Sequence, residues 1–552
     1  MTQADQFFIL SEEHARLSAK YEQVLNRLSI SEELSQNLSI ENRILKDEIA
    51  RLKGTPQQPK LRKNRIEGES SESKSKKKEN GTSRGKHPRK NKKGLSFQLT
   101  KKLKPENLPA GAKYKDCSKY DVQDIVYTAF NTRYIIERWQ LPDGTYTYGK
   151  LPENVQGHYG AALKAHVIEL AHSGRMSEGL ILQQLRERGI AISAGQLSKM
   201  LTEGFEGFHE EKEGILKAAL ESGQIQTDDV GTRHKAKNCY TNVICSDHFV
   251  YLSTTASKSR INFLEILARG KNEYRFNEDA IAYLEIHKGA EKLIQALRVR
   301  PNLVIETTEP EKAFRKEMGH LNATEIRLMT ESGIFGSLIE HGVPRDLHIH
   351  SDDAGQFDLF HNSLCWVHEE RHYRKMIGSD SKMSAEVEQI REEIWLLYQG
   401  LKRYKEDPSE KEHRKLSEAF EKVFKPEKPS KYQVINDRLA LTYAKKNRLL
   451  CVLDRPETPL HNNSSEIGGR GAKVKCKISG GTRSDKGRNC WDTFGSLNLT
   501  CRRLGISFYD FLIDRLLGVN KIEQLGDAIR EKTQLSASTN FARSLAISLG
   551  VA

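Results

Sequence analysis

A seven-residue repeat of apolar positions runs through residues 7–52. One position of the repeat is apolar except at Ser31, and a second position lies three or four residues away from it. Alternating spacings of three and four keep a narrow stripe on one helix face, which predicts a coiled coil over residues 1–53 and a homo-oligomer, a dimer, formed through it. A single long helix packed on the body is the alternative. The first position holds Leu10, Leu17, Val24, Leu38, Leu45 and Leu52, and the second holds Phe7, His14, Tyr21, Leu28, Ser35, Asn42 and Ile49.

Short amphipathic elements follow in residues 105–220. Alternation over residues 133–148, around Pro142-Asp143-Gly144, predicts a β-hairpin. Helical spacing predicts helices over residues 159–172, 177–188 and 193–202, with a break at Gly189. The last two fit a helix-turn-helix, although other small helical hairpins give the same pattern. In a helix-turn-helix, the DNA contacts of the second helix are expected from Gln196, Ser198 and Lys199.

From residue 221 to about 515 the pattern alternates between strands and helices. Strands are predicted at residues 225–227, 240–245, 249–254 and 347–351, and a helix at 261–268. Asp228 and Asp352 are expected at strand ends. Helical inserts are predicted at about 278–342 and 381–447, and a helical tail at 516–552. The fold class is therefore multi-domain α/β.

Charge changes this picture at one segment. The net charge is +14, and residues 54–104 hold 17 Lys and Arg against 4 Asp and Glu. A basic segment with few apolar residues is predicted to be a disordered arm that neutralises DNA phosphates, with a solvated linker as the alternative. Candidate DNA-binding residues of the arm are Lys76, Lys77, Lys78, Arg89, Lys90, Lys92 and Lys93.

The 8 cysteines include no CxxC pair, which argues against a disulfide framework and a cysteine zinc finger. No run of 18 apolar residues and no signal pattern is present, so a cytoplasmic protein associated with the nucleoid is expected.

Three carboxylates are candidates for a magnesium site: Asp228, Asp352 and Glu466. Two Mg²⁺ ions need several hard oxygen ligands that converge from different elements. Many other acid triples exist in the chain, and the nearest substitutes are Asp229, Asp353 and Glu457.

The surroundings of these acids resemble the three catalytic blocks of the insertion-sequence-66-type (IS66 family) bacterial DDE transposases. The resemblance implies an RNase H-like catalytic core in which Asp228, Asp352 and Glu466 bind Mg²⁺, with Mn²⁺ as a substitute. The segments that carry it are Thr227–Gly231 (TDDVG), Ser351–Phe357 (SDDAGQF), Leu364–Tyr373 (LCWVHEERHY), Asn462–Arg470 (NNSSEIGGR), Ser479–Gly487 (SGGTRSDKG) and the helix at 491–503.

The chain departs from the family pattern at several positions. Asp229 stands where Glu is common, His461 where Asp is common, and Ile467 where Arg is common. The family's four-cysteine zinc segment is replaced by Cys117 alone, so no structural zinc is expected. All three implied ligands are present, which favours an active enzyme.

A rival motif is His368-Glu369-Glu370-Arg371-His372, a literal HExxH of zinc peptidases, with Glu388 or Glu392 as a third ligand. His348 and His350 raise a second metal alternative, but packing or DNA contact is favoured for them because Mg²⁺ seldom takes imidazole.

The expected function is therefore an Mg-dependent DNA transposase that binds element ends and cuts and joins DNA, with accessory element-encoded proteins as further partners. Arg371, Arg470, Arg483, Lys486 and Arg488 are candidates for phosphate contacts, as are Lys473 and Lys475. The alternatives are a domesticated DNA-binding protein that has lost transposition and, less favoured, the zinc peptidase.

Overall fold

The computed structural model describes residues 100, 127–152, 155 and 157–535. The predicted coiled coil and all named lysines and arginines of the basic arm lie outside these residues. The described residues from 127 to 535 belong to one compact unit of mixed α/β structure. No helix in the described part of the chain is long and apolar enough to cross a membrane.

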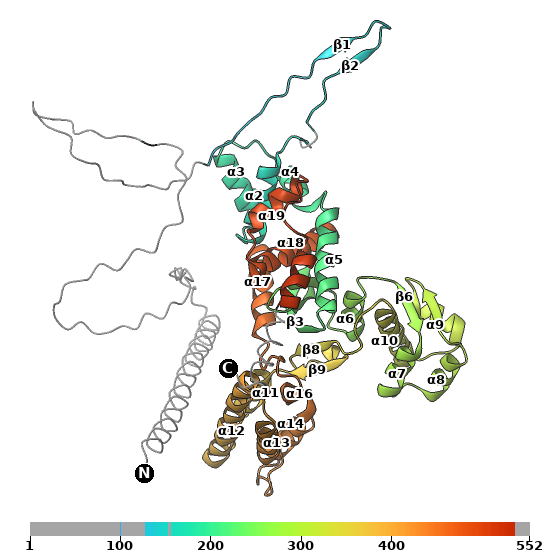
Figure 1. The fold of residues 1–552 in the computed structure, drawn as a ribbon, viewed down its shortest axis with the longest axis vertical. Coiled ribbons are helices and arrows are strands. Elements are labelled where there is room, and N and C mark those ends of the chain that lie inside the picture. The colour runs from blue at the N-terminus through green and yellow to red at the C-terminus, as the bar shows by residue number, and fades with distance from the viewer. Residues whose placement is uncertain (1–99, 101–126, 153–154, 156, 536–552) are drawn as a thin grey trace, which may run out of the picture. The chain divides into compact units, whose positions relative to one another are not determined.

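A five-stranded sheet lies at the centre of this unit, in the order β5-β4-β3-β8-β9 (Figure 1). β3, β4 and β5 are antiparallel neighbours, whereas β8 runs parallel to β3 and β9 parallel to β8. The strands span Gln224–His234 (β3), Lys237–Cys245 (β4), Val250–Thr255 (β5), His348–Ser351 (β8) and His361–Leu364 (β9).

The prediction that Asp228 ends a strand is wrong, because β3 continues through it to His234. β8 pairs with β3 only opposite Gln224–Gln226, while β4 pairs with β3 along almost its whole length, and Asp228 is opposite Val243. Asp352 does follow its strand directly. β8 therefore runs beside only the first residues of β3.

Helices cover the sheet. α17 (Asn463–Ser479) packs on β3 and β4, α18 (Asp485–Leu504) packs on β5, and α5 (Glu206–Glu221) contacts β3 and β5. Side chains at Gly468 and Gly469 would collide with Val243 and Val230, so these two glycines allow α17 to approach the sheet closely.

The first insert is mostly helical over the predicted range 278–342, but it also contains a short strand that was not predicted. A four-residue strand inside it, β7 (Leu303–Glu306), pairs with β6 (Glu273–Phe276), and the two strands lie with the helices of the insert (Figure 1). α10 packs on β6 because Gly333 and Gly336 leave room for it. The helices near this insert are α6 (Arg260–Leu267), α7 (Glu278–Ile286), α8 (Glu291–Arg298), α9 (Pro310–Met318) and α10 (Ala323–Glu340).

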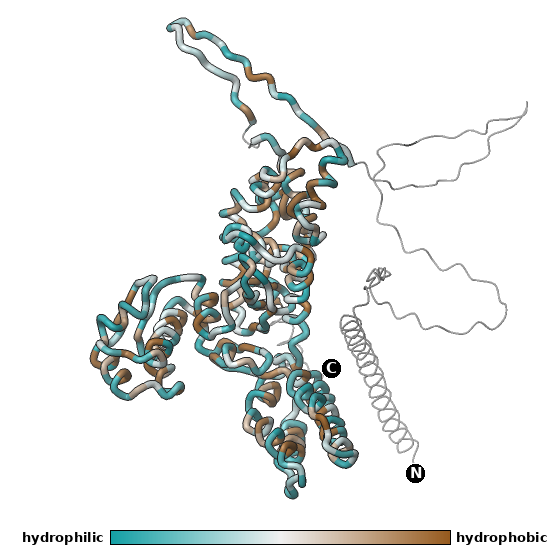
Figure 2. Tube along the Cα trace, turned by 180° about the vertical axis from the view of Figure 1, so that it is seen from behind, coloured by the Kyte–Doolittle hydropathy of each residue, from teal (hydrophilic) through white to brown (hydrophobic). Residues whose placement is uncertain are grey.

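The second insert is helical in all its elements, and apolar and polar residues alternate along it (Figure 2). Its core contains Trp366, Tyr373 and Phe420, all buried. The elements are α11 (Trp366–Arg374), which leads into it, α12 (Ser381–Glu406), α13 (Glu410–Phe424), α14 (Gln433–Tyr443), α15 (Lys446–Leu449) and α16 (Cys451–Asp454).

The elements before α5 agree closely with the ranges predicted for them. α2 (Ala161–His172), α3 (Glu178–Glu187) and α4 (Ala194–Thr202) pack on one another, and Ser177 and Ser193 cap the last two. The hairpin has strands of three residues, β1 (Arg138–Gln140) and β2 (Tyr146–Tyr148). At the other end of the chain α19 (Phe508–Leu516) and a helix over 525–535 follow α18.

Candidate active site

Side-chain and backbone contacts bring Asp228, Asp352 and Glu466 to one place on the sheet. β8 delivers Asp352 beside β3, as its register shows. Asn462 is buried, and its side-chain Nδ2 donates a hydrogen bond to the backbone carbonyl of Thr227 at 2.9 Å. This bond fixes the start of α17 beside Asp228. Glu466 lies in the first turn of α17. Residues more than a hundred positions apart are thus joined through one hydrogen bond.

A buried cysteine connects the second and third acids. The Cys365 amide donates to Ser351 O at 3.0 Å, and its Sγ accepts from the Asn462 amide at 3.3 Å. One residue further on, the Trp366 amide donates to Leu460 O at 3.0 Å. Burial raises the pKa of the Cys365 thiol to about 11, so it remains a neutral thiol. This cysteine is therefore a structural link and not a nucleophile.

The carboxylates sense one another electrostatically. Burial, with the charges of Asp352, Asp229 and Glu466, raises the pKa of Asp228 to about 7, against the backbone hydrogen bond from Asp229. Burial also raises the pKa of Asp352. The surroundings therefore disfavour the ionised forms of Asp228 and Asp352, and the charge of Glu466 adds to the effect on Asp228.

Four further side chains lie beside these acids, and two of them, Lys258 and Gln356, were not assigned a role from the sequence. Lys258 pairs with Asp229, and Gln356 Nε2 donates to Asp229 at 2.6 Å. His368 Nε2 lies 3.4 Å from Glu466 Oε1, and Arg371 lies 3.9 Å from the same oxygen. Gln356 and His368 belong to the quoted motifs, whereas nothing in the sequence pattern indicated Lys258.

The donor set suits a hard divalent cation. All three ligands would be carboxylate oxygens, which Mg²⁺ prefers, and the raised pKa of Asp228 reflects charge that a cation would compensate. Within the described residues, no three His, Cys, Asp or Glu side chains form a metal-binding cluster. Glu466 lies against His368 and Arg371.

The HExxH segment does not present a catalytic glutamate. Glu369 is buried, accepts a hydrogen bond from Thr442 at 2.6 Å, and pairs with Arg438 and with Lys445. Burial would raise its pKa, but the Thr442 hydrogen bond and the two positive charges outweigh burial and lower it. Glu369 therefore joins α11 to α14, and it is not available to activate water.

His348 and His350 are packing residues. Both are buried, and Ser363 Oγ on β9 lies 2.7 Å from His348 Nε2 and 2.9 Å from His350 Nδ1. Burial lowers the pKa of His350 to about 3 and that of His348 to about 4. The two neutral histidines therefore join β8 to β9. This agrees with the packing role expected for them and not with DNA contact.

The candidate DNA-binding residues divide into three places. Gln196 and Lys199 are exposed on α4, and Ser198 is partly exposed. Arg371 and Arg470 flank Glu466 on α11 and α17. Arg483, Lys486 and Arg488 are not brought to the acids. They lie at the start of α18, where Lys235 at the tip of the β3–β4 hairpin pairs with Asp485 at 2.6 Å.

Lys475 is not a surface phosphate contact. Its ammonium donates to the carbonyls of Met176, at 3.1 Å, and Ala171. Lys473 remains exposed.

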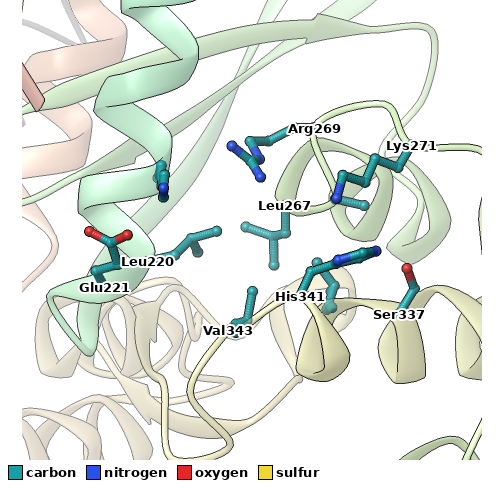
Figure 3. A pocket seen from close by; sticks show the side chains of 12 residues that line it. Leu220, Glu221, Leu267, Arg269, Lys271, Ser337, His341 and Val343 are labelled. Carbon is teal, nitrogen blue, oxygen red and sulfur yellow. The ribbon is translucent and has the colours of Figure 1, made fainter.

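A small cavity of about 60 Å³ lies apart from these residues, between α5 and the ends of α6 and α10. Arg269, Lys271 and His341 surround it, with Glu221 at its edge (Figure 3). Its volume is far below that of ordinary ligand pockets, so it is not a competing site.

A family model described as the transposase IS66 family matches residues 354–489. An uncharacterized protein, y4jO, of Sinorhizobium fredii (strain NBRC 101917 / NGR234) is 36% identical over 305 residues, which are 55% of this chain and 94% of that protein. The chain belongs to the IS66 transposase family. No solved structure matches it.

Membership in this family identifies a transposase. The segment of the chain that matches the family model begins two residues after Asp352 and includes Glu466. Asp228 and Asp352 lie outside the match, so their roles rest on the geometry described above.

Proposed function

We propose that this IS66-family transposase binds the ends of its element and catalyses Mg-dependent DNA strand cleavage and strand transfer. The convergence of Asp228, Asp352 and Glu466 on β3, β8 and α17 carries the proposal. A sheet of three antiparallel strands followed by two parallel ones supports an RNase H-like core.

The chain's own residues have separable roles in this reaction. Asp228, Asp352 and Glu466 hold the metal ions. Two Mg²⁺ ions bound there would activate the attacking oxygen and stabilise the leaving oxygen. Lys258 neutralises Asp229, which keeps that neighbouring carboxylate out of the ligand set. His368 and Arg371 support the Glu466 carboxylate.

DNA is held by basic and polar groups on separate elements. Gln196, Ser198 and Lys199 on α4 act as contacts of a helix-turn-helix, which the packing of α3 and α4 and their serine caps support. Arg371 and Arg470 contact phosphates beside the acids. The basic arm, a dimer through the predicted coiled coil and accessory element-encoded proteins complete the proposed assembly.

The test compares two adjacent aspartates. Purified full-length protein is incubated with labelled element-end DNA and MgCl₂ or MnCl₂, alongside Asp352→Asn and Asp353→Asn. Asp353 is the matched control because it pairs with Lys445 and Arg448 rather than with the acids. We expect nicking and joining by the wild type and Asp353→Asn but not by Asp352→Asn or in EDTA. Binding without cleavage by the wild type would contradict the enzyme and favour the domesticated DNA-binding protein.

A further inference from the structure

A second cavity, of about 520 Å³, lies between α2–α4 and the α17–α18 connection. We call it the α4–α18 cavity. Its volume falls within the range of pockets that hold small organic ligands, roughly 300–1,000 Å³. None of the three candidate acids lines it. Its walls include Ala171, His172, Met176, Ser177, Glu178, Gly179, Ser198, Leu201, Thr202, Lys475, Ile478, Ser479, Gly481, Thr482, Arg483, Ser484, Gly487, Cys490 and Trp491.

The lining combines aromatic, hydroxyl and cationic groups. Lys475 Nζ lies 5.7 Å from the centre of the Trp491 ring. Arg483 is exposed and adds a second cation, against a single acid, Glu178. Ser198 and Thr202 supply hydroxyls from α4. A net positive lining with aromatic walls suits a ligand that is both flat and anionic, as a nucleotide is.

The position of the cavity relates it to both proposed DNA contacts. Ser198 in its wall is on the same helix as the exposed Gln196 and Lys199. Lys486 reaches Glu203 at 3.6 Å, which joins the end of α4 to the start of α18. On α17, Lys475 follows Glu466 by nine residues, a rise of about 14 Å along one helix, or roughly four base-pair steps of DNA.

We propose that the α4–α18 cavity receives one nucleotide turned out of the DNA duplex bound by this protein. This inference rests on the proposed DNA binding and adds a binding site to it. The base lies among Trp491, His172 and the α4 hydroxyls, and its phosphate lies toward Arg483. The extruded nucleotide is roughly four base pairs from the scissile phosphate, by the helix rise given above.

The experiment measures binding of full-length protein to two labelled duplexes of the same sequence. One is fully paired and the other carries a single unpaired thymidine, which need not be pulled out of a base pair. We expect the unpaired thymidine to tighten binding about tenfold. Thr202→Phe, which fills the cavity from α4, removes this preference and leaves the affinity for paired DNA unchanged. Gln183→Phe, exposed on α3 and outside the cavity, keeps the preference.

A second variant, Ser479→Phe, fills the cavity from the opposite wall and covers the case in which Thr202→Phe does not fold. Equal affinity of the wild type for both duplexes, or a preference retained in the folded filled variants, overturns the cavity proposal while DNA binding stands. Failure to bind either duplex overturns the proposed function itself, and the cavity proposal with it. Tight binding of free thymidine monophosphate with no preference between the duplexes assigns the cavity to a free nucleotide instead, which also overturns the proposal.

Discussion

An acid of the candidate site and an acid of helix α11 behave in opposite ways. Burial, followed by the charges of Asp352, Asp229 and Glu466, raises the pKa of Asp228 to about 7. Glu369, although more deeply buried, has a lowered pKa because Thr442, Arg438 and Lys445 surround it. Burial alone therefore does not decide the pKa of these acids. Glu369 differs from Asp228 because a hydrogen bond and two cations stabilise its ionised form.

The largest effect is expected from a substitution of Glu466, one of the three candidate acids. Glu466→Gln keeps the shape of the side chain but loses a charged ligand, and we expect DNA cleavage to fall by about a thousandfold or more. The measurement is the initial cleavage rate on labelled element-end DNA. Glu457→Gln, an exposed acid in the segment before α17, is the control and should cleave normally. Equal loss in both variants would refute the choice of Glu466.

The second largest effect is expected from a substitution of Glu369, which pairs with Arg438 and Lys445. Glu369→Gln leaves Arg438 and Lys445 partly buried without their counter-charge, so we expect the free energy of unfolding to fall by about 3 kcal/mol. Urea denaturation followed by circular dichroism measures it. Glu427→Gln, exposed in the same insert, should change nothing. If Glu369→Gln is as stable as the wild type, the ion pairs do not stabilise the insert.

Removing the carboxylate of Asp228 should raise, and not lower, the free energy of unfolding. The folded pKa of Asp228, about 7, is above its ordinary value of 3.8, so ionising the group destabilises the fold as pH rises through this window. Asp228→Asn should therefore raise the free energy of unfolding by about 1–2 kcal/mol at pH 8. The gain should shrink toward pH 4, where the wild-type carboxyl is protonated. A gain that is independent of pH would point to packing instead.

Metal binding should produce the smallest shift. At about ten times its dissociation constant, Mg²⁺ should stabilise the wild type by about 1.4 kcal/mol and Asp352→Asn by less. Thermal melts with MgCl₂ and with matched ionic strength of NaCl measure the difference. Identical shifts in both proteins would contradict a metal site that includes Asp352.

Much of this organisation could be predicted from local patterns. Alternation over residues 347–351 ended in acids and placed Asp352 directly after β8, and helical spacing placed α3 and α4 nearly to the residue. Asp228 was misplaced because the length of β3 depends on β4, a pairing that alternation does not reveal. β7 was missed since four residues within a helical stretch give little periodic signal.

The contacts around the candidate acids could not be predicted from local sequence patterns. Asn462 is one of two consecutive asparagines, and only the fold shows that its amide reaches Thr227. Likewise, Lys258 lies in the segment between β5 and α6, and only the fold shows that it pairs with Asp229. Long-range partners of this kind depend on tertiary packing, and the family resemblance was needed to choose among the acids.

The hydrogen bond between the Trp366 amide and Leu460 O closes a loop of nearly a hundred residues at its base. The second insert therefore leaves and rejoins the catalytic framework at a single point, much as an inserted domain does. Changes in the length of this insert are therefore expected to leave the position of Glu466 relative to Asp352 unchanged. A protease cut between α12 and α13 should for the same reason leave the two halves of the site assembled.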